Sequence, residues 1–279
     1  MLETMECKLT PNIKLATVLS LAAAVSAYSC IPPEKPAGPE GHAHTFNFNY
    51  EGETGPLNWH HIDPANSACA HGKHQSPIDI NSNSVALAPR GSVRINIPEA
   101  PTAKLENLGS GLEVVLTNGS LTTPNGNYQL AQFHWHTPSE HRVNQQHSPM
   151  EAHFVFKDAE NRIAVVGFLI ELSEIGSSTC LFDSIFSLTH AVYHPGEYVH
   201  TGPLDFTQIN HHLDLNPPYQ YSGSLTTPPC TEGVSWYVSS QPMLLSVQSY
   251  NKVKRLLKFN ARYIQNTLGA ENLLQVSED

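Results

Sequence analysis

The chain has 279 residues, of which 40% are hydrophobic and 14% charged, an ordinary globular composition with enough apolar side chains for a sizeable core. Its formal charge of −10 at pH 7 argues against nucleic acid as a partner, because phosphate binding needs clustered Lys and Arg side chains. The length allows one large domain or two small ones. Since the sequence shows no internal repeat and no internal linker, we expect a single domain.

Residues 1–27 have the features of a secretion signal. Lys8 and Lys14 supply a positive end, residues 15–25 form a short apolar run, and Val25-Ser26-Ala27 is a small-x-small cleavage site. The apolar run is too short to span a bilayer, so no transmembrane segment is predicted. We expect a secreted, extracellular protein, with a periplasmic location as the alternative.

Residues 28–41 are rich in proline and are predicted to be an extended linker, which leaves residues 42–279 as the single domain. A lipid anchor at Cys30 is disfavoured, because Tyr28 is bulky where lipoprotein signals have small residues. After cleavage four cysteines remain, an even number that suggests disulfides in an exported chain but allows three pairings. They are Cys30, Cys69, Cys180 and Cys230.

The middle of the chain has the pattern of β-strands. Residues 92–97, 112–117 and 128–135 alternate apolar with polar positions, and Asn118-Gly119 and Asn125-Gly126 are turn signals between them. Asn118 also begins a glycosylation sequon, and whether it is used is left open.

Helical patterns are fewer than strand patterns. Residues 163–172 are nearly all apolar, which is typical of a strand buried on both faces, whereas 178–192 and 246–257 are the predicted helices. Many strands with few helices predict a mixed α/β fold that is mainly β, with one large sheet and peripheral helices.

Three histidines on two predicted strands form a candidate metal site. In Gln132-Phe133-His134-Trp135-His136, the two histidines share one face because side chains alternate along a strand. His153 shares a face with Glu151 in the next strand. If the two strands are antiparallel neighbours, three imidazoles converge, which is how a catalytic zinc with one open position is held. Any one of 16 histidines is more commonly an ordinary polar residue, so the flanking chemistry matters.

Two polar residues flank these histidines on the same strand faces. Gln132 shares the face of His134, and Glu151 shares the face of His153, so each can accept the second ring N–H of a ligand and fix its orientation. A loop further on, 222–230, holds Thr226 and Thr227 before two prolines. It is a weak signal by itself, although Val234 and Trp236 alternate behind it and could wall an apolar pocket.

Taken together, these motifs resemble those of the α-class carbonic anhydrases, in family order and over about residues 46–274. The motifs are Tyr50, Gly55-Pro56 and Trp59, then Gln75-Ser76-Pro77-Ile78, Gln132-Phe133-His134-Trp135-His136, Ser139-Glu140-His141, Glu151-Ala152-His153, Leu225-Thr226-Thr227-Pro228-Pro229, Asn260 and Arg262.

The resemblance implies a single domain with a central, twisted, mostly antiparallel sheet of about ten strands. It also implies reversible hydration of carbon dioxide to bicarbonate by hydroxide on one zinc ion per chain. His134, His136 and His153 become the zinc ligands. The outer partners of the ligands become Gln132, Glu151 and Asn260.

Further roles follow from the same resemblance. Thr226 accepts the hydrogen bond of the zinc-bound hydroxide and donates to Glu140, while Tyr50 and Thr227 belong to the solvent network. Carbon dioxide is small and apolar, so it needs an apolar slot. The residues at those positions are Val155, Val165, Leu225, Val234 and Trp236.

A further implication of the resemblance concerns the proton that hydration releases. Ser110 occupies the position where fast members carry a proton-shuttling histidine, and a serine does not titrate near neutral pH. We therefore expect turnover to be limited by proton transfer.

The resemblance also implies a disulfide. Cys69 and Cys230 match the pair that is bridged in exported members, which leaves Cys30 and Cys180 for a second bridge.

Two other functions remain to be weighed against a carbonic anhydrase acting on a small-molecule substrate. A non-catalytic binding module of the same family would have lost a ligand histidine, yet all three are present. An exported zinc-storage protein is favoured only by additional histidines, which would bind several zinc ions per chain. They are His42, His44, His60, His61, His211 and His212.

Overall fold

The computed structural model describes residues 38–277. The predicted signal, Cys30 and most of the predicted linker lie outside the described residues. Strand pairing begins with β1 (Gly41–His42) against β13 (Glu197–His200), so Gly41 belongs to a strand although the linker was predicted to end there.

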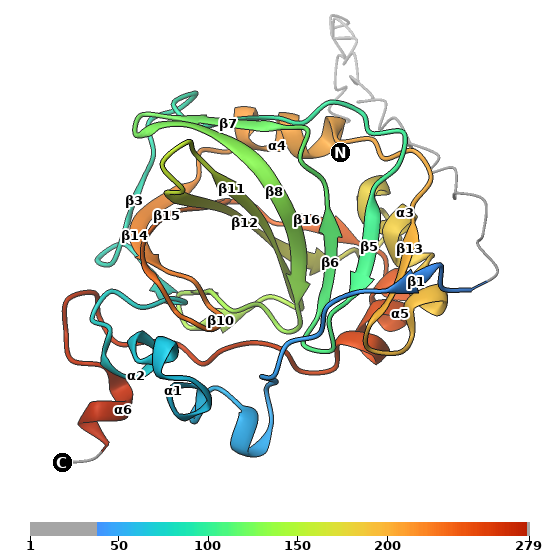
Figure 1. Cartoon of the computed structure of the whole chain (residues 1–279). Helices are drawn as coiled ribbons and strands as arrows, with labels where there is room; N and C mark the ends of the chain where they lie inside the picture. Colours follow the sequence, from blue (N-terminus) through green and yellow to red (C-terminus); the bar gives the residue numbers. More distant parts are fainter. Residues whose placement is uncertain (1–37, 278–279) are drawn as a thin grey trace, which may run out of the picture.

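Within residues 38–277, thirteen strands form one large curved sheet, ten of them in a continuous path (Figure 1). Its pairs are antiparallel, except that β12 runs parallel to β15 and β16. The predicted large, mostly antiparallel sheet of about ten strands is confirmed. After β1 and β13 the path continues with β5 (Lys104–Asn107), β6 (Leu112–Val115), β8 (Gly126–His136), β11 (Met150–Lys157), β12 (Ile163–Leu172), β15 (Glu232–Val238), β14 (Tyr219–Ser224) and β3 (Ala86–Leu87), and the strands off the path are β4 (Arg94–Asn96), β7 (Ser120–Thr123) and β16 (Met243–Leu245).

Short helices surround this sheet and a small second sheet (Figure 1). The second sheet consists of β2 (Asp79–Ile80), β9 (Arg142–Val143) and β10 (Gln146–His147). The α-helices are α1 (Trp59–Ile62), α2 (Ala68–His71), α3 (Cys180–Phe186), α4 (Thr207–Leu215), α5 (Val247–Leu257) and α6 (Leu273–Val276), and the 3-10 helices are η1 (Gly52–Thr54), η2 (Pro64–Asn66) and η3 (Thr189–Val192). No helix among the described residues is long and apolar enough to cross a membrane.

Two predicted helices are found with shifted ends. The predicted helix 178–192 is divided into α3 and η3. The other is α5, which begins after Ser246, whose side chain accepts from the Ser249 N–H at 3.1 Å as an N-cap. The pattern analysis does not predict α4, because only Ile209 and Leu213 of that helix are buried.

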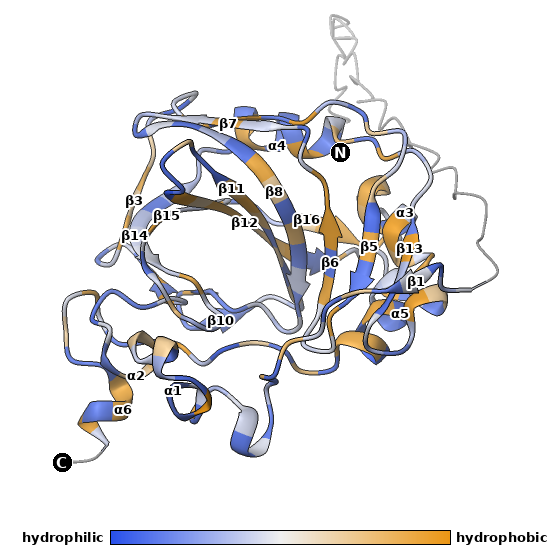
Figure 2. Cartoon of the chain, in the orientation of Figure 1, coloured by the Kyte–Doolittle hydropathy of each residue, from blue (hydrophilic) through white to orange (hydrophobic). Residues whose placement is uncertain are grey.

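The two faces of β8 and β11 have different neighbours. Phe133, Trp135 and Phe154 point into the main hydrophobic core, and the rings of Phe133 and Phe154 stack with centroids 4.6 Å apart. The alternate positions of β8 are polar, which gives the strand its alternating orange and blue bands (Figure 2). This alternation fixes the register, because a slip of one residue would turn the aromatic side chains out of the core.

Candidate metal centre

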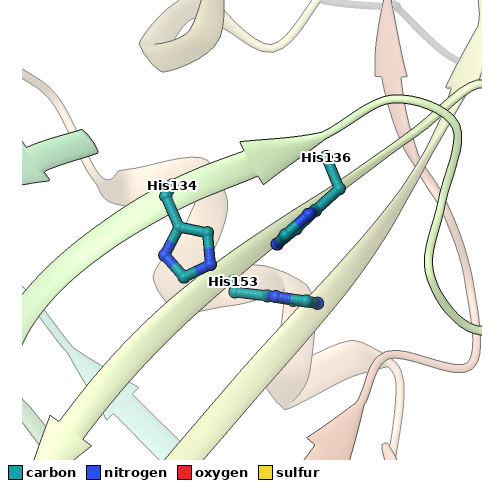
Figure 3. Close-up of side chains that lie close together, drawn as sticks. All are labelled: His134, His136 and His153. Carbon is teal, nitrogen blue, oxygen red and sulfur yellow. The ribbon is translucent and has the colours of Figure 1, made fainter. Parts of the chain in front are cut away.

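Strand pairing brings the three predicted ligand histidines together. β8 and β11 are antiparallel, with His134 opposite His153 and His136 opposite Glu151. The three rings face a common point (Figure 3), and one ligand nitrogen from each lies within 4.8 Å of the others. The predicted convergence of imidazoles from neighbouring antiparallel strands is found.

Each of these rings has one nitrogen engaged by an acceptor, which leaves the other for a metal. His134 Nδ1 lies 2.8 Å from Gln132 Oε1, His136 Nδ1 lies 2.7 Å from the backbone oxygen of Asn260, and His153 Nε2 lies 2.9 Å from Glu151 Oε1. Because an amide oxygen, a backbone carbonyl and a carboxylate only accept, each of these nitrogens carries the proton. The nitrogens left over are Nε2 of His134, Nε2 of His136 and Nδ1 of His153.

The side chain of Asn260 has a separate role in holding the end of β8. Its Oδ1 accepts from the Thr137 N–H at 2.7 Å and its Nδ2 donates to the Trp135 carbonyl at 2.9 Å. Asn260 therefore fixes the strand on both sides of His136 while its own carbonyl orients that ring.

Burial keeps the three imidazoles neutral. It lowers the pKa of His134 well below the ordinary value, lowers the pKa of His136 to about 4, and also lowers the pKa of His153. Metal binding needs the unprotonated ring. The buried Nε2 of His136 has no hydrogen-bond partner among the described residues. A buried ring nitrogen that has no hydrogen-bond partner and lies beside two other neutral imidazoles fits a metal ligand. Three imidazole nitrogens are a ligand set that suits zinc.

A second buried chain of hydrogen bonds extends away from His153. Glu151 Oε1 also accepts from His141 Nδ1 at 2.7 Å, and His141 Nε2 lies 2.7 Å from the Tyr221 hydroxyl. Tyr221 in turn lies 2.8 Å from Ser76 Oγ. One ligand atom each of His141, Glu151 and His153 also lies within 4.8 Å of the others, close enough to hold a metal ion. Since their polar atoms bond to one another, we regard them as support for the first centre.

Glu140 and Thr226 lie beside the histidines, as the resemblance implies. Glu140 is fully buried, its Oε1 accepts from the Arg262 N–H at 2.8 Å, and burial raises its pKa to about 7. The Thr226 hydroxyl acts on this carboxyl as a donor that lowers the pKa. The other carboxyl oxygen, Glu140 Oε2, is buried and has no hydrogen-bond partner among the described residues.

A cavity of about 200 Å³, which we call the apolar cavity after one of its walls, opens next to His134 and His153, with Gln132 and Lys157 among its polar lining. Four of the five predicted wall residues line it, together with Thr226 and Thr227. The fifth, Val234, is buried in the same hydrophobic cluster as Val155, Val165 and Trp236. The wall residues are Val155, Val165, Leu225 and Trp236.

A smaller cavity of about 100 Å³, which we call the inner cavity, lies on the polar side of the same histidines. Tyr50, Ser110 and Thr227 line it together with His134 and His136. The inner cavity also contains Glu113, which the sequence reasoning missed. Its place opposite His134 in the pairing of β6 with β8 could have been found by the same parity argument that found Gln132.

The predicted disulfide is present and braces the threonine loop. Cys69 and Cys230 are bonded, with Cα atoms 5.1 Å apart. The Cys230 N–H donates to the Thr227 carbonyl at 2.9 Å, so the bridge lies directly beside that loop. Cys180 is disulfide-bonded as well, while Cys30 lies outside the described residues.

Sequence reasoning also gave no role to His141 and Arg262, although both stand in the quoted motifs. The Arg262 guanidinium is buried and donates to Gln75 Oε1, the Ser76 carbonyl and the Cys69 carbonyl at 2.8–3.1 Å. It thus ties the disulfide region to the segment that holds Glu140. No local pattern signals such a contact, because the partners lie more than 180 positions away in the chain.

Comparison with known proteins agrees with this geometry. The family model for eukaryotic-type carbonic anhydrases matches residues 54–272. Alpha carbonic anhydrase 4 of Arabidopsis thaliana is 31% identical over 242 residues, covering 82% of this chain and 87% of the relative.

Solved structures give the same result. A fungal alpha carbonic anhydrase from Aspergillus oryzae is 55% identical, with a TM-score of 0.81 over 84% of this chain and 99% of that one. The alpha-carbonic anhydrase of Thermovibrio ammonificans, solved with the inhibitor sulfanilamide, is 32% identical, with a TM-score of 0.72 over 81% of this chain and 98% of that one. The chain therefore belongs to the eukaryotic-type α-carbonic anhydrase family.

Proposed function

We propose that this carbonic anhydrase interconverts carbon dioxide and bicarbonate at one zinc ion held by His134, His136 and His153. The observation that carries the assignment is the set of three neutral imidazoles, each fixed by an acceptor and each with its second nitrogen directed to one point. In carbonic anhydrases, the family for which the value is known, bound zinc lowers the pKa of water to about 7 and so supplies a nucleophile at neutral pH.

Thr226 orients the attacking oxygen in this proposal. When the Thr226 hydroxyl donates to Glu140, its lone pairs face the cavity and accept a hydrogen bond from the attacking oxygen. That bond directs an oxygen lone pair toward the substrate carbon, which lowers the barrier by positioning. Arg262 supports the arrangement, because its backbone N–H fixes Glu140.

The apolar cavity is the site that we assign to carbon dioxide. Its wall of Val155, Val165, Leu225 and Trp236 offers no strong hydrogen bond to compete with water, which suits a small apolar molecule. Bicarbonate is charged and is less favourable in such surroundings, so the wall also assists product release.

The two alternative functions fit the site less well. A binding module has no need of the combination of three ligand histidines with Thr226 and Glu140. Storage of several zinc ions is disfavoured. Within residues 38–277, both groups of three candidate metal ligands include His153, so they cannot hold two ions independently.

We also propose that the protein is exported. The sequence before residue 28 has the pattern of a secretion signal, and the Cys69–Cys230 disulfide is typical of oxidising compartments. The single domain is proposed to start near residue 42.

The test is stopped-flow hydration of carbon dioxide by zinc-loaded and chelator-treated protein, with zinc per chain measured on the same samples. We expect activity only with metal and close to one zinc per chain. Several zinc ions with negligible hydration would favour storage, and one zinc ion without hydration would favour a binding module.

A further inference from the structure

The hydration reaction leaves a proton that the site must export. Carbon dioxide and water give bicarbonate and one proton per turnover, so each cycle ends with a proton at the metal centre. Ser110 lies at the position where the family resemblance calls for a shuttle, and its hydroxyl does not titrate near neutral pH. A group that can store a proton has to lie elsewhere along the solvent path.

A larger cavity extends the solvent path beyond Ser110. This outer cavity, of about 360 Å³, shares Tyr50, Ser110 and Asn260 with the inner cavity that contains His134 and His136. These three residues therefore form a wall that is common to the two cavities. The outer cavity is also lined by His194, which is exposed to solvent. Water in the two cavities would link the metal centre to that imidazole.

Two loops that line the outer cavity are fastened together by Asn107. Asn107 Nδ2 donates to the Val192 carbonyl at 2.9 Å, and Asn107 Oδ1 accepts from the Gly109 N–H at 2.9 Å. The Gly196 N–H donates to the Asn107 carbonyl at 2.7 Å. The segment that carries His194 is thereby held against the loop that carries Ser110.

Contacts with Tyr193 and Glu197 restrict the position of the His194 imidazole. The backbone N–H of His194 donates to Glu197 Oε2 at 2.7 Å, and its ring makes an edge contact with Tyr193 at a centroid distance of 5.2 Å. Other titratable or charged groups around the same cavity are Tyr50, Glu51, Arg255 and Lys258.

We propose that His194 is the proton acceptor of this enzyme and takes the place that Ser110 cannot fill. A ring nitrogen of neutral His194 receives the proton through water in the two cavities, and the protonated ring passes a proton to buffer in bulk solvent. The net step is transfer of one proton from the water consumed in hydration to a base in bulk solvent. This inference depends on the proposed function, because it concerns the proton that hydration generates.

One other histidine near the inner cavity is the competing candidate. The ring of His44 makes an edge contact with Phe46 at 5.5 Å, and Phe46 lines the inner cavity. His44 itself does not line either cavity. We therefore favour His194, and include His44→Ala in the test.

The kinetic test measures carbon dioxide hydration in dilute non-imidazole buffer. His194→Ala should lower kcat about tenfold or more, less than the ~10²-fold or larger effect of many positioned acids and bases, because water alone conducts some protons. Its kcat/KM should stay near wild type, since carbon dioxide attack precedes proton export. Free imidazole should restore kcat, and so should Ser110→His added to His194→Ala. His211→Ala, at an exposed position on α4, is the matched control and should behave as wild type.

A second measurement does not depend on activity. In NMR titrations of metal-free protein, the amide signals of Gly109 and Ser110 should shift with the midpoint of the His194 ring. The part of these shifts that follows the His194 ring should vanish in His194→Ala, whereas any part due to Glu113, which also lines the inner cavity and has a pKa of about 7, should remain. Amide shifts that are identical in wild type and variant would contradict the proposed adjacency.

The outcomes separate this inference from the function itself. Unchanged kcat of His194→Ala in dilute buffer, or a loss of kcat in His44→Ala instead, would overturn the His194 assignment and leave the hydration activity intact. Zinc-loaded wild-type protein that fails to hydrate carbon dioxide in any buffer would overturn the proposed function first.

Discussion

Glu151 Oε1 lies 2.9 Å from His153 Nε2, inside a pocket where both side chains are almost wholly buried. The same oxygen accepts from His141, and the other carboxylate oxygen accepts two backbone N–H groups. Interaction with the neighbouring histidines outweighs burial and holds the Glu151 pKa well below its usual value. An ionised acceptor at this place fixes the tautomer of His153 that offers Nδ1 to a metal.

Removing His153 should abolish zinc binding. His153→Ala leaves two imidazoles, which hold zinc poorly, so metal and hydration activity should disappear together. Zinc per chain after dialysis is measured by mass spectrometry, with circular dichroism to confirm folding and His211→Ala as the control. Full activity without bound metal would refute the zinc assignment.

Weakening the hydrogen-bond acceptor of His153, which is the Glu151 carboxylate, should reduce zinc affinity without eliminating zinc binding. In Glu151→Gln a neutral amide replaces the carboxylate, so His153 loses its charged acceptor. We expect zinc affinity to fall ~10–100-fold, the range for loss of a partner behind a ligand. Competition with a chelator measures this affinity. Glu106→Gln removes a buried carboxyl that bonds to no ligand histidine and should leave zinc affinity unchanged.

Thr226→Ala should retain zinc and lose turnover. Loss of one positioned hydrogen bond in a preorganised site costs about 10²-fold or more in kcat. Thr226→Ser keeps the hydroxyl and should recover most of the activity, which distinguishes positioning from packing. Stopped-flow hydration of samples with equal zinc content makes the comparison. A zinc-loaded Thr226→Ala enzyme with near wild-type kcat would exclude the proposed role.

The strand pattern predicted the convergence of the three histidines because its geometry is local. His134, His136 and His153 lie on two consecutive strands of the path, where alternation alone decides which side chains share a face. The parity argument placed Gln132 and Glu151 correctly for the same reason. The resemblance added Thr226 and Glu140, which no periodicity connects.

The remaining features depend on contacts between distant segments. Arg262 contacts Cys69 and Gln75 across more than 180 residues, and the segment that carries His194 is held to the Ser110 loop by the bond from Asn107 to the Val192 carbonyl. Such contacts arise from packing after the sheet has formed. Sequence spacing therefore gives no indication of them. Alternation with Trp236 gives Val234 a shared face without showing how deep each side chain lies, so the place of Val234 on the cavity wall stays a prediction.

The Cys69–Cys230 bridge should contribute strongly to stability. It closes a loop with a sequence separation of 161 residues, for which the chain-entropy relation gives roughly 5 kcal/mol, an upper figure. We expect the Cys69→Ser, Cys230→Ser double variant to lose about 2–5 kcal/mol in the free energy of unfolding, measured by urea denaturation. The single Cys69→Ser variant should lose as much. Peptide mapping that finds Cys69 bonded to Cys180 would contradict the pairing.

The last prediction concerns the pH dependence contributed by Glu113. Burial, with a smaller effect from the nearby Glu106, raises the Glu113 pKa from 4.5 to about 7. A carboxyl with a raised pKa in the folded state favours folding fully below its unfolded pKa, and this contribution is lost as the pH rises through the folded pKa. Glu113→Gln resembles the protonated form at every pH. In metal-free protein its melting temperature relative to wild type should therefore rise between about pH 4.5 and 7 and stay constant above. Calorimetry at several pH values checks this, with Glu174→Gln in an exposed loop as the control for loss of a surface charge. If the difference in melting temperature between Glu113→Gln and wild type does not change between about pH 4.5 and 7, then ionising Glu113 does not destabilise the folded protein and its cavity is well solvated.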